Sequence, residues 1–169
     1  MVRCFGFGFF VLPEKRVSHC MGNCTVSKDF LAQAGDPTAT GSGGECIWSY
    51  IASGSNGGQG KDTGIARHFV PDLVPRLKHT EKGTVSMVVA PGPDGSRGQC
   101  GSQFFITLSD NIEYLDGKHA VFGHVVEGME TLDKLNEVFA DSEGRPFKDV
   151  RIRHVVVLGE SGSICLRMF

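Results

Sequence analysis

The sequence predicts a mainly β fold, an antiparallel β-barrel or sandwich with one or two helices. Glycine supplies 23 of the 169 residues, about twice its usual share, and glycine disfavours long helices. Short apolar runs rich in β-branched and aromatic residues recur between turn signals, which is typical of strands. Only one stretch has a clear helical period. A chain of this length corresponds to a single domain.

Five stretches are expected to form strands, and they cover residues 25–33, 84–90, 103–108, 119–126 and 150–158. The first stretch ends in Ala34-Gly35-Asp36-Pro37, a turn signal, because proline fixes φ and glycine permits unusual backbone angles. Two long loops rich in glycine are expected over 41–64 and 91–98, where the residues have little tendency to form a strand or a helix.

One amphipathic helix is expected over 128–139. Its apolar residues recur at a spacing of three to four, with charged residues between them, as in a helix that packs one face on a core. Five side chains are expected on that face: Met129, Leu132, Leu135, Val138 and Phe139.

Charge and composition exclude several function classes. The net charge of −2 excludes a broad basic surface, so we expect no direct nucleic-acid binding. No run of about 18 apolar residues occurs, so we expect no membrane span. Cys20 and Cys24 form the one close cysteine pair among six cysteines, whereas a zinc site usually needs a second pair. Asp62 follows Lys61 where a phosphate loop needs Ser or Thr. We therefore expect neither a metal nor a cofactor.

Residues 1–22 form an atypical N-terminal segment. Arg3 and the apolar run over 4–12 are similar to the start of a signal peptide, but Pro13 ends the run and no cleavage site follows. We therefore do not expect secretion, and the cysteines are interpreted as thiols of a reducing compartment.

Four segments, in order, indicate a family: Phe30-Leu31-Ala32-Gln33-Ala34-Gly35-Asp36, Lys82-Gly83-Thr84-Val85-Ser86-Met87, Gly101-Ser102-Gln103-Phe104-Phe105-Ile106-Thr107 and Tyr114-Leu115-Asp116-Gly117-Lys118-His119-Ala120-Val121-Phe122-Gly123. Together they closely resemble the cyclophilins, the β-barrel peptidyl-prolyl cis-trans isomerases, over about residues 25–158. Residues 25–30 and 151–154 resemble the subgroup in which a cyclophilin domain precedes an RNA-recognition module. No such module is expected within these residues.

The resemblance implies a cyclophilin-like antiparallel β-barrel with capping helices over residues 23–160, followed by a C-terminal tail over 161–169. The family's N-terminal part, two strands and a helix, has no recognisable counterpart in residues 1–22, where 5–12 offers at most one strand. The barrel is therefore expected to be incomplete at the N-terminus, with an uncovered strand edge.

The resemblance assigns a substrate-binding groove to nine residues: Phe30, Leu31, Gln33, Val88, Gln103, Phe105, Tyr114, Leu115 and His119. The apolar members would hold a proline ring, and the two glutamines would orient the peptide backbone. Considered without the resemblance, the apolar members fit ordinary core packing equally well.

Two departures from the family pattern concern this groove. Thr25 occupies the position of an arginine that hydrogen-bonds the proline nitrogen, so no catalytic residue is intact, and one such donor is typically worth about 10²–10³ in rate. Tyr114 stands where the resemblance implies a tryptophan at the groove mouth, which keeps an aromatic wall but changes its polar edge, so high cyclosporin affinity is not expected.

The resemblance implies a peptidyl-prolyl cis-trans isomerase (rotamase) that acts weakly on X–Pro bonds in protein folding or conformational switching. The alternative is a proline-peptide binding module without turnover, and RNA-processing assemblies are a further possibility for its setting. The expected partners are proline-containing peptides or proteins, with RNA-processing partners implied by the subgroup alone. A monomer in the nucleus is expected, with the cytoplasm as the alternative.

Overall fold

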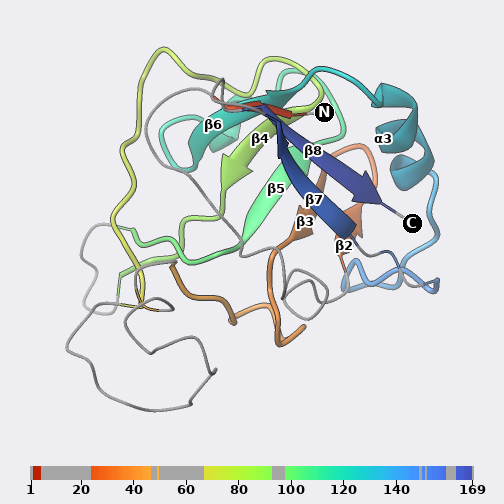
Figure 1. Cartoon of the computed structure of the whole chain (residues 1–169), viewed down its shortest axis with the longest axis horizontal. Coiled ribbons are helices and arrows are strands. Elements are labelled where there is room, and N and C mark those ends of the chain that lie inside the picture. Colours follow the sequence, from red (N-terminus) through yellow and green to blue (C-terminus); the bar gives the residue numbers. More distant parts are fainter. Residues whose placement is uncertain are drawn as a thin grey trace.

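Figure 1 shows the computed structural model, which describes residues 2–4, 24–46, 49, 67–92, 98–148, 150, 152–158 and 163–168. The elements named within these ranges are strands, a short 3-10 helix and an α-helix. In chain order these are β1 (Val2–Cys4), β2 (Thr25–Ser27), β3 (Leu31–Ala34), β4 (Thr84–Met87), β5 (Phe104–Thr107), η1 (Glu113–Leu115), β6 (Ala120–Val125), α3 (Met129–Asn136), β7 (Ile152–Leu158) and β8 (Ser163–Met168).

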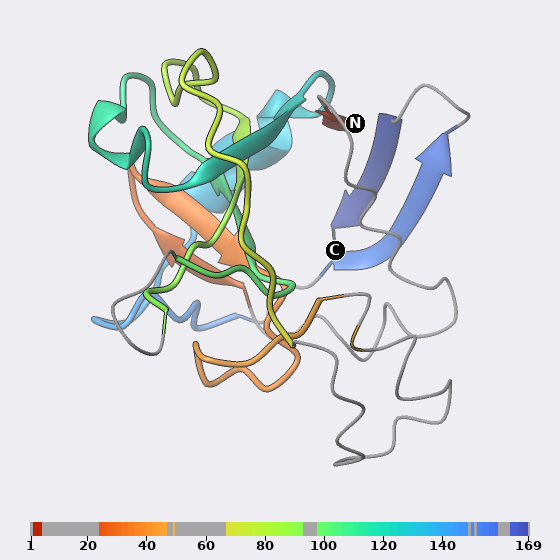
Figure 2. The same ribbon diagram turned by 90° about the vertical axis from the view of Figure 1, so that its left-hand side faces the viewer.

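The strands form one antiparallel sheet in the order β2-β3-β5-β4-β6-β1-β8-β7. Figure 2 shows the β7–β8 hairpin standing beside the body built from β2 to β6, with β1 near the top between the two. Among the described residues β2 and β7 are the edges, so the sheet is not closed. The predicted mainly β, antiparallel fold is confirmed, and the barrel is open.

The prediction of one strand over 25–33 is wrong, because the chain reverses there to form β2 and β3. The N–H of Phe30 donates to the Ser27 carbonyl at 3.1 Å, and Asp29 has a φ of 55°, which aspartate tolerates better than most residues. Asp29 and Asn136 bind each other: the Asp29 N–H donates to Asn136 Oδ1 at 2.7 Å, and Asn136 Nδ2 donates to Asp29 Oδ1 at 2.7 Å. The turn is thereby attached to the end of α3.

The other predicted strands are confirmed as β4, β5, β6 and β7, each shorter than expected. β8 was not predicted, and it falls in the range expected as a tail. In the N-terminal segment, β1 pairs with both β6 and β8, whereas residues 5–12 lie outside the described residues. Most of the two predicted glycine-rich loops also lies outside them.

The main core lies between α3 and the inner face of the sheet. Leu132 and Leu135 are 3% and 1% exposed and pack with Val85 and Ile106, which is how an amphipathic helix stabilises a sheet. The prediction that Phe139 packs on this face is wrong. The helix ends at Asn136, and the Phe139 side chain beyond it is 84% exposed.

Candidate functional site

One face of the sheet carries a row of side chains aligned by the strand register. Thr25 is paired with Gln33, Gln33 with Phe105, and Phe105 with Ser86. Directly opposed residues of neighbouring strands project to the same face. The main core, which includes Ala32, packs on the other face. The side chains of this row therefore lie outside the main core.

An apolar cluster surrounds Phe105 on that face, and we call it the Phe105 cluster. Its centre is buried: Phe105 is 2% exposed, and it packs with Ile112 and Leu115. Partly buried side chains border this centre, and they are Phe30, Leu31 and Val88. The structure therefore brings together all the aliphatic and phenylalanine residues assigned to the groove, from four separate segments of the chain. Ile112 is an addition that the sequence analysis did not assign.

Aromatic contacts extend the Phe105 cluster in two directions. The ring of Tyr114 stacks on Phe30, with centroids 5.6 Å apart and an interplanar angle of 28°. The ring of His119 meets Phe105 edge to face at 5.2 Å and 88°. Such pairs typically contribute about 0.5–1.5 kcal/mol beyond area burial. Tyr114 is 59% exposed, so an aromatic surface remains open to solvent beside the buried centre.

Two glutamine amides lie next to the Phe105 cluster and bind each other. Gln33 Nε2 donates to Gln103 Oε1 at 2.6 Å. Gln103 Nε2 donates to the carbonyl oxygens of Gly41 and Gly43 at 3.0 and 2.7 Å. Gln103 is buried and Gln33 is half-buried, so the outer amide is the one that solvent reaches.

His119 is held as a neutral imidazole. Its Nδ1 accepts the N–H of Val89 at 3.2 Å, which requires that nitrogen to be unprotonated. Burial lowers the pKa of His119 below its usual value of 6.5, because desolvation disfavours the charged ring. At neutral pH the ring therefore presents an uncharged edge.

His79 is a site residue that the sequence analysis missed. Its side chain is fully buried and stacks on Phe105 with centroids 5.8 Å apart. Its Nδ1 lies 2.8 Å from Asp116 Oδ1, and its Nε2 lies 2.7 Å from Ser86 Oγ. The sequence offers no signal for this role, since a lone histidine is more often a satisfied core or surface residue. Through Ser86 and Asp116, His79 connects β4 to the turn that follows Leu115.

The carboxylate of Asp116 also accepts the backbone N–H of His79 at 2.9 Å. Desolvation acts to raise the pKa of Asp116, but its hydrogen bonds and attraction to His79 outweigh this and hold the pKa below 3.8. The ionised form is therefore the one that fixes the turn after η1.

Thr25 lies on the same face as the Phe105 cluster and is half-buried. It stands where the cyclophilin resemblance places an arginine, so the row carries a short hydroxyl there and no positive charge. The neighbouring Cys24 is buried, and burial raises the pKa of its thiol to about 11. Cys24 is therefore a protonated core side chain at neutral pH.

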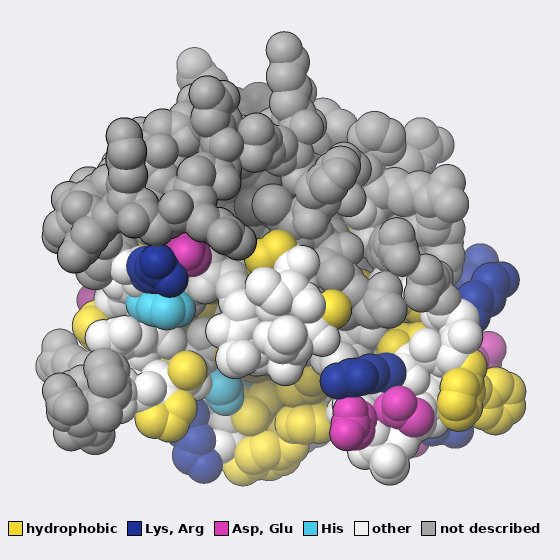
Figure 3. Space-filling view, turned by 90° about the horizontal axis from the view of Figure 1, so that it is seen from below, with side chains coloured by type: hydrophobic (Ala, Val, Ile, Leu, Met, Phe, Trp, Pro, Cys, Tyr) yellow, Lys and Arg dark blue, Asp and Glu magenta, His cyan; other side chains and the backbone are white. Residues whose placement is uncertain are grey.

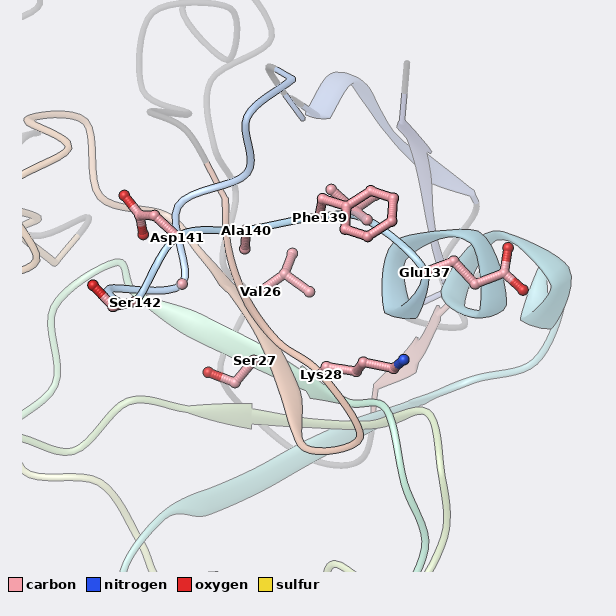
Figure 4. Close-up of a pocket in the computed structure, with 10 residues that line it drawn as sticks. Val26, Ser27, Lys28, Glu137, Phe139, Ala140, Asp141 and Ser142 are labelled. Carbon is pink, nitrogen blue, oxygen red and sulfur yellow. The ribbon is translucent and has the colours of Figure 1, made fainter.

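A separate pocket of about 660 Å³ lies between the β2 edge and the chain after α3. Figure 4 shows Val26, Ser27 and Lys28 on one side and Phe139, Ala140, Asp141 and Ser142 on the other. It shares no lining residue with the Phe105 cluster. Phe139 is exposed over most of its surface at this pocket.

Surface charge in the described part of the chain is mixed. Figure 3 shows hydrophobic side chains gathered beside a histidine, with basic and acidic side chains interspersed around them. Within the described ranges, no group of three or more His, Cys, Asp or Glu could hold a metal ion. None of the described helices has the length and apolar character needed to cross a membrane.

Known proteins are similar to this chain in sequence and in fold. The family model described as cyclophilin type peptidyl-prolyl cis-trans isomerase matches residues 21–157. A Cryptococcus neoformans protein named peptidyl-prolyl cis-trans isomerase-like 4 is 60% identical over 134 residues, which are 79% of this chain and 25% of that protein. A human protein of the same name is 44% identical over 146 residues, 86% of this chain and 26% of that protein. This chain thus spans about a quarter of the length of these curated relatives.

A solved structure shows the same fold. A cyclophilin-type isomerase of Cryptosporidium parvum, crystallised in the presence of the dipeptide Ala-Pro, superposes with a TM-score of 0.70 at 29% identity. The superposition covers 90% of this chain and 83% of the other.

Proposed function

This chain belongs to the cyclophilin-type peptidyl-prolyl cis-trans isomerase family, and on that premise we propose that the Phe105 cluster binds X–Pro peptides and isomerises them slowly. The observation that carries the proposal is the convergence of Phe30, Leu31, Phe105 and Leu115 beside two amides and a neutral histidine. The matched relatives named as isomerases support it, as does the related protein crystallised with Ala-Pro.

Isomerisation needs one side of the X–Pro bond to be held while the other side turns. The barrier is about 18–20 kcal/mol because amide resonance is broken in the twisted state. The apolar side chains around Phe105 suit a proline ring, which is compact and lacks a backbone donor. The half-buried rings of Phe30 and His119 would flank the ring, and Tyr114 would contact the residue beside it.

The amide of Gln33 would bind the peptide backbone on one side of the turning bond. It keeps an N–H and a carbonyl oxygen beyond its bond to Gln103. Hydrogen bonds to one side of the bond restrain that side and leave the other free to rotate, so Gln33 would serve orientation. Val88, directly after β4, and His119, directly before β6, would bound the same site.

Thr25 is the reason to propose slow turnover. The twisted amide has a pyramidal nitrogen that becomes a better hydrogen-bond acceptor than it is in the planar ground state. A charged donor aimed at this nitrogen acts on the transition state alone, and such interactions raise kcat. The shorter, uncharged side chain of Thr25 would supply no comparable donor.

The alternative function is a proline-peptide binding module without turnover. Thr25 favours it, because binding of the planar ground state requires only the apolar side chains and the amides. The two functions share one site and differ in a single measurable quantity, the exchange rate between cis and trans peptide.

The experiment titrates the ¹⁵N-labelled chain with an Ala-Pro peptide and follows the cis and trans peptide signals by NMR exchange spectroscopy. We expect shifts centred on residues of the Phe105 cluster and slow, measurable exchange. Phe30→Ala should abolish the shifts, and Phe147→Ala is the matched control, because Phe147 is 79% exposed and lies outside the cluster. Equal binding by Phe30→Ala and wild type would contradict the proposed site.

We also propose a nuclear location and partners in RNA processing, on the resemblance of residues 25–30 and 151–154 to the subgroup with an RNA-recognition module. The matched residues make up only about a quarter of these relatives, which leaves room for such a module. Imaging of the fluorescently tagged full-length protein in cells tests the location, and affinity purification of the same protein followed by mass spectrometry tests the partners. A purely cytoplasmic signal would contradict the nuclear proposal.

A further inference from the structure

Asp36 organises the loop that follows β3. Its Oδ1 accepts the backbone N–H and the hydroxyl of Thr38 at 2.8 and 2.7 Å. Its Oδ2 accepts the N–H of Gly41 at 2.6 Å and that of Gly43 at 3.4 Å. Both carboxylate oxygens are therefore used inside the loop, which wraps around a single side chain.

The loop closes this tightly only with glycine at position 43. A Cβ on Gly43 would lie 2.2 Å from Asp36 Oδ1 and 2.3 Å from Thr38 Oγ1. Both distances are far below any van der Waals contact. An added methyl group would therefore displace the carboxylate from its donors.

Two carbonyl groups of the same loop fix the side-chain amide of Gln103. Gln103 Nε2 lies 3.0 Å from Gly41 O and 2.7 Å from Gly43 O. The reversed amide would place Oε1 against two carbonyl oxygens, so the nitrogen must face the loop. Oε1 then faces outward, where Gln33 Nε2 donates to it at 2.6 Å.

These hydrogen bonds leave the two glutamines with different capacities to bind a ligand. Both side-chain N–H groups of Gln103 donate to carbonyl oxygens of the loop. A primary amide has no third N–H group. Gln33 donates one side-chain N–H to Gln103, which leaves its second N–H and its side-chain carbonyl oxygen for a ligand. Gln33 is therefore the only one of the pair that can donate to a ligand.

We propose that Asp36 is a positioning residue for the peptide site: through the Gly41 and Gly43 carbonyls it orients Gln103, and Gln103 orients the ligand-binding amide of Gln33. This inference rests on the proposed function for its ligand. Asp36 is not a member of the Phe105 cluster, and it acts through three successive hydrogen-bonded steps.

Ionisation of Asp36 agrees with this role. Desolvation acts to raise the pKa of Asp36, but hydrogen bonds from Thr38, Gly41 and Gly43 outweigh it and hold the pKa below 3.8. The carboxylate is thus fully ionised at neutral pH. Hydrogen bonds to a charged acceptor are about twice as strong as neutral ones.

The test compares Asp36→Asn with Asp72→Asn in the whole 169-residue chain. Asp72 is exposed, so both variants lose one negative charge, but only the first replaces the acceptor of Gly41 and Gly43 with an amide. NMR measures how fast the side-chain amide protons of Gln103 exchange with water. Titration with an Ala-Pro peptide gives the Kd, and thermal unfolding reports whether each variant remains folded.

We expect Asp36→Asn to accelerate Gln103 amide exchange at least about tenfold and to raise the peptide Kd at least about tenfold. We expect Asp72→Asn to change neither quantity. A purely structural role would lower the melting temperature and leave the Kd of the folded fraction unchanged, and that result would overturn the proposal.

Gly43→Ala provides a second variant that keeps the charge of Asp36. It should reproduce both effects, because its Cβ occupies the space of the carboxylate. Unchanged Gln103 exchange in either loop variant overturns the positioning role, whether or not the peptide binds. If Gln103 is protected in the wild-type chain and no peptide binds, the proposed function fails, and the ligand-binding role of Gln33 fails with it.

Discussion

Thr25 lies directly opposite Gln33 in the register of β2 and β3. Gln33 in turn lies opposite Phe105, so the threonine, the amide and the buried ring occupy one row on one face. The position where the family pattern has a charged donor is thus beside the site, and the residue there is short and neutral. Under the proposed function, this relationship would separate the binding of a prolyl peptide from its catalysed rotation.

Replacement of Phe105 should disrupt both the packing of the Phe105 cluster and the proposed peptide-binding site. Phe105→Ala deletes a ring that is 2% exposed, and large-to-small changes of this kind cost about 3–5 kcal/mol. We expect denaturant unfolding to show a loss of that size and peptide titration to show no binding. Phe139→Ala, at an 84% exposed ring, is the control and should change stability by less than about 0.5 kcal/mol. A Phe105→Ala chain as stable as wild type would show that the ring is not packed as described.

Acid should weaken the contact between Asp116 and His79. The folded-state pKa of Asp116 is below 3.8, so its contribution to the free energy of unfolding is complete above pH 3.8. That contribution is lost as the pH falls through the folded-state pKa. We expect the stability of wild type to fall below pH 3.8 more steeply than that of Asp116→Asn. Equal slopes for the two proteins would contradict the depressed pKa.

At neutral pH, Asp116→Asn should be less stable than wild type by about 1.5–3 kcal/mol, the range for a hydrogen bond to a charged group. The variant leaves the buried ring of His79 without its charged partner. Chemical denaturation at pH 7 measures the difference, and a difference of zero would exclude a stabilising role for this contact.

Peptide affinity should be constant above pH 6.5 and should fall in more acidic buffer. The pKa of His119 is below 6.5, and protonation of Nδ1 would break its bond from the Val89 N–H. The free energy of unfolding should change in the same direction as the peptide affinity. As the pH falls below 6.5, His119 is protonated in the unfolded chain before it is protonated in the folded chain, so the folded state loses stability. NMR titration of the His119 ring signals gives the midpoint, and a midpoint above 6.5 would contradict the burial of the neutral ring.

The sequence predicted the mainly β class and four of the strands because apolar residues and turn signals alternate clearly there. It failed at residues 25–33, where Ser27, Lys28 and Asp29 carry no proline or glycine. The turn exists because Asp29 adopts a positive φ and because Asn136, far away in sequence, binds it. Such long-range support cannot be inferred from local propensity.

The apolar part of the site was predictable from motif resemblance, since its residues lie within a few recognisable segments. The polar residues that hold this part of the site in place were not predictable. His79 stacks on Phe105 and is held by Asp116 and Ser86, whereas Asp36 is linked to Gln103 through the carbonyls of a loop. None of these contacts has a spacing rule in the sequence. Phe139 was wrongly assigned to the buried face of the helix. The apolar spacing in the sequence extends to Phe139, but the helix ends at Asn136.

The central claim is that this chain binds prolyl peptides and that Thr25 limits their isomerisation. The most direct measurement is the isomerisation rate of one Ala-Pro peptide, as kcat/KM, by wild type and by Thr25→Arg under identical conditions. We predict that the arginine variant is faster by about 10²–10³ and that both proteins bind the peptide with similar Kd. Equal kcat/KM for the two proteins, or a wild-type rate already as high as that of an arginine-bearing cyclophilin, would contradict the claim.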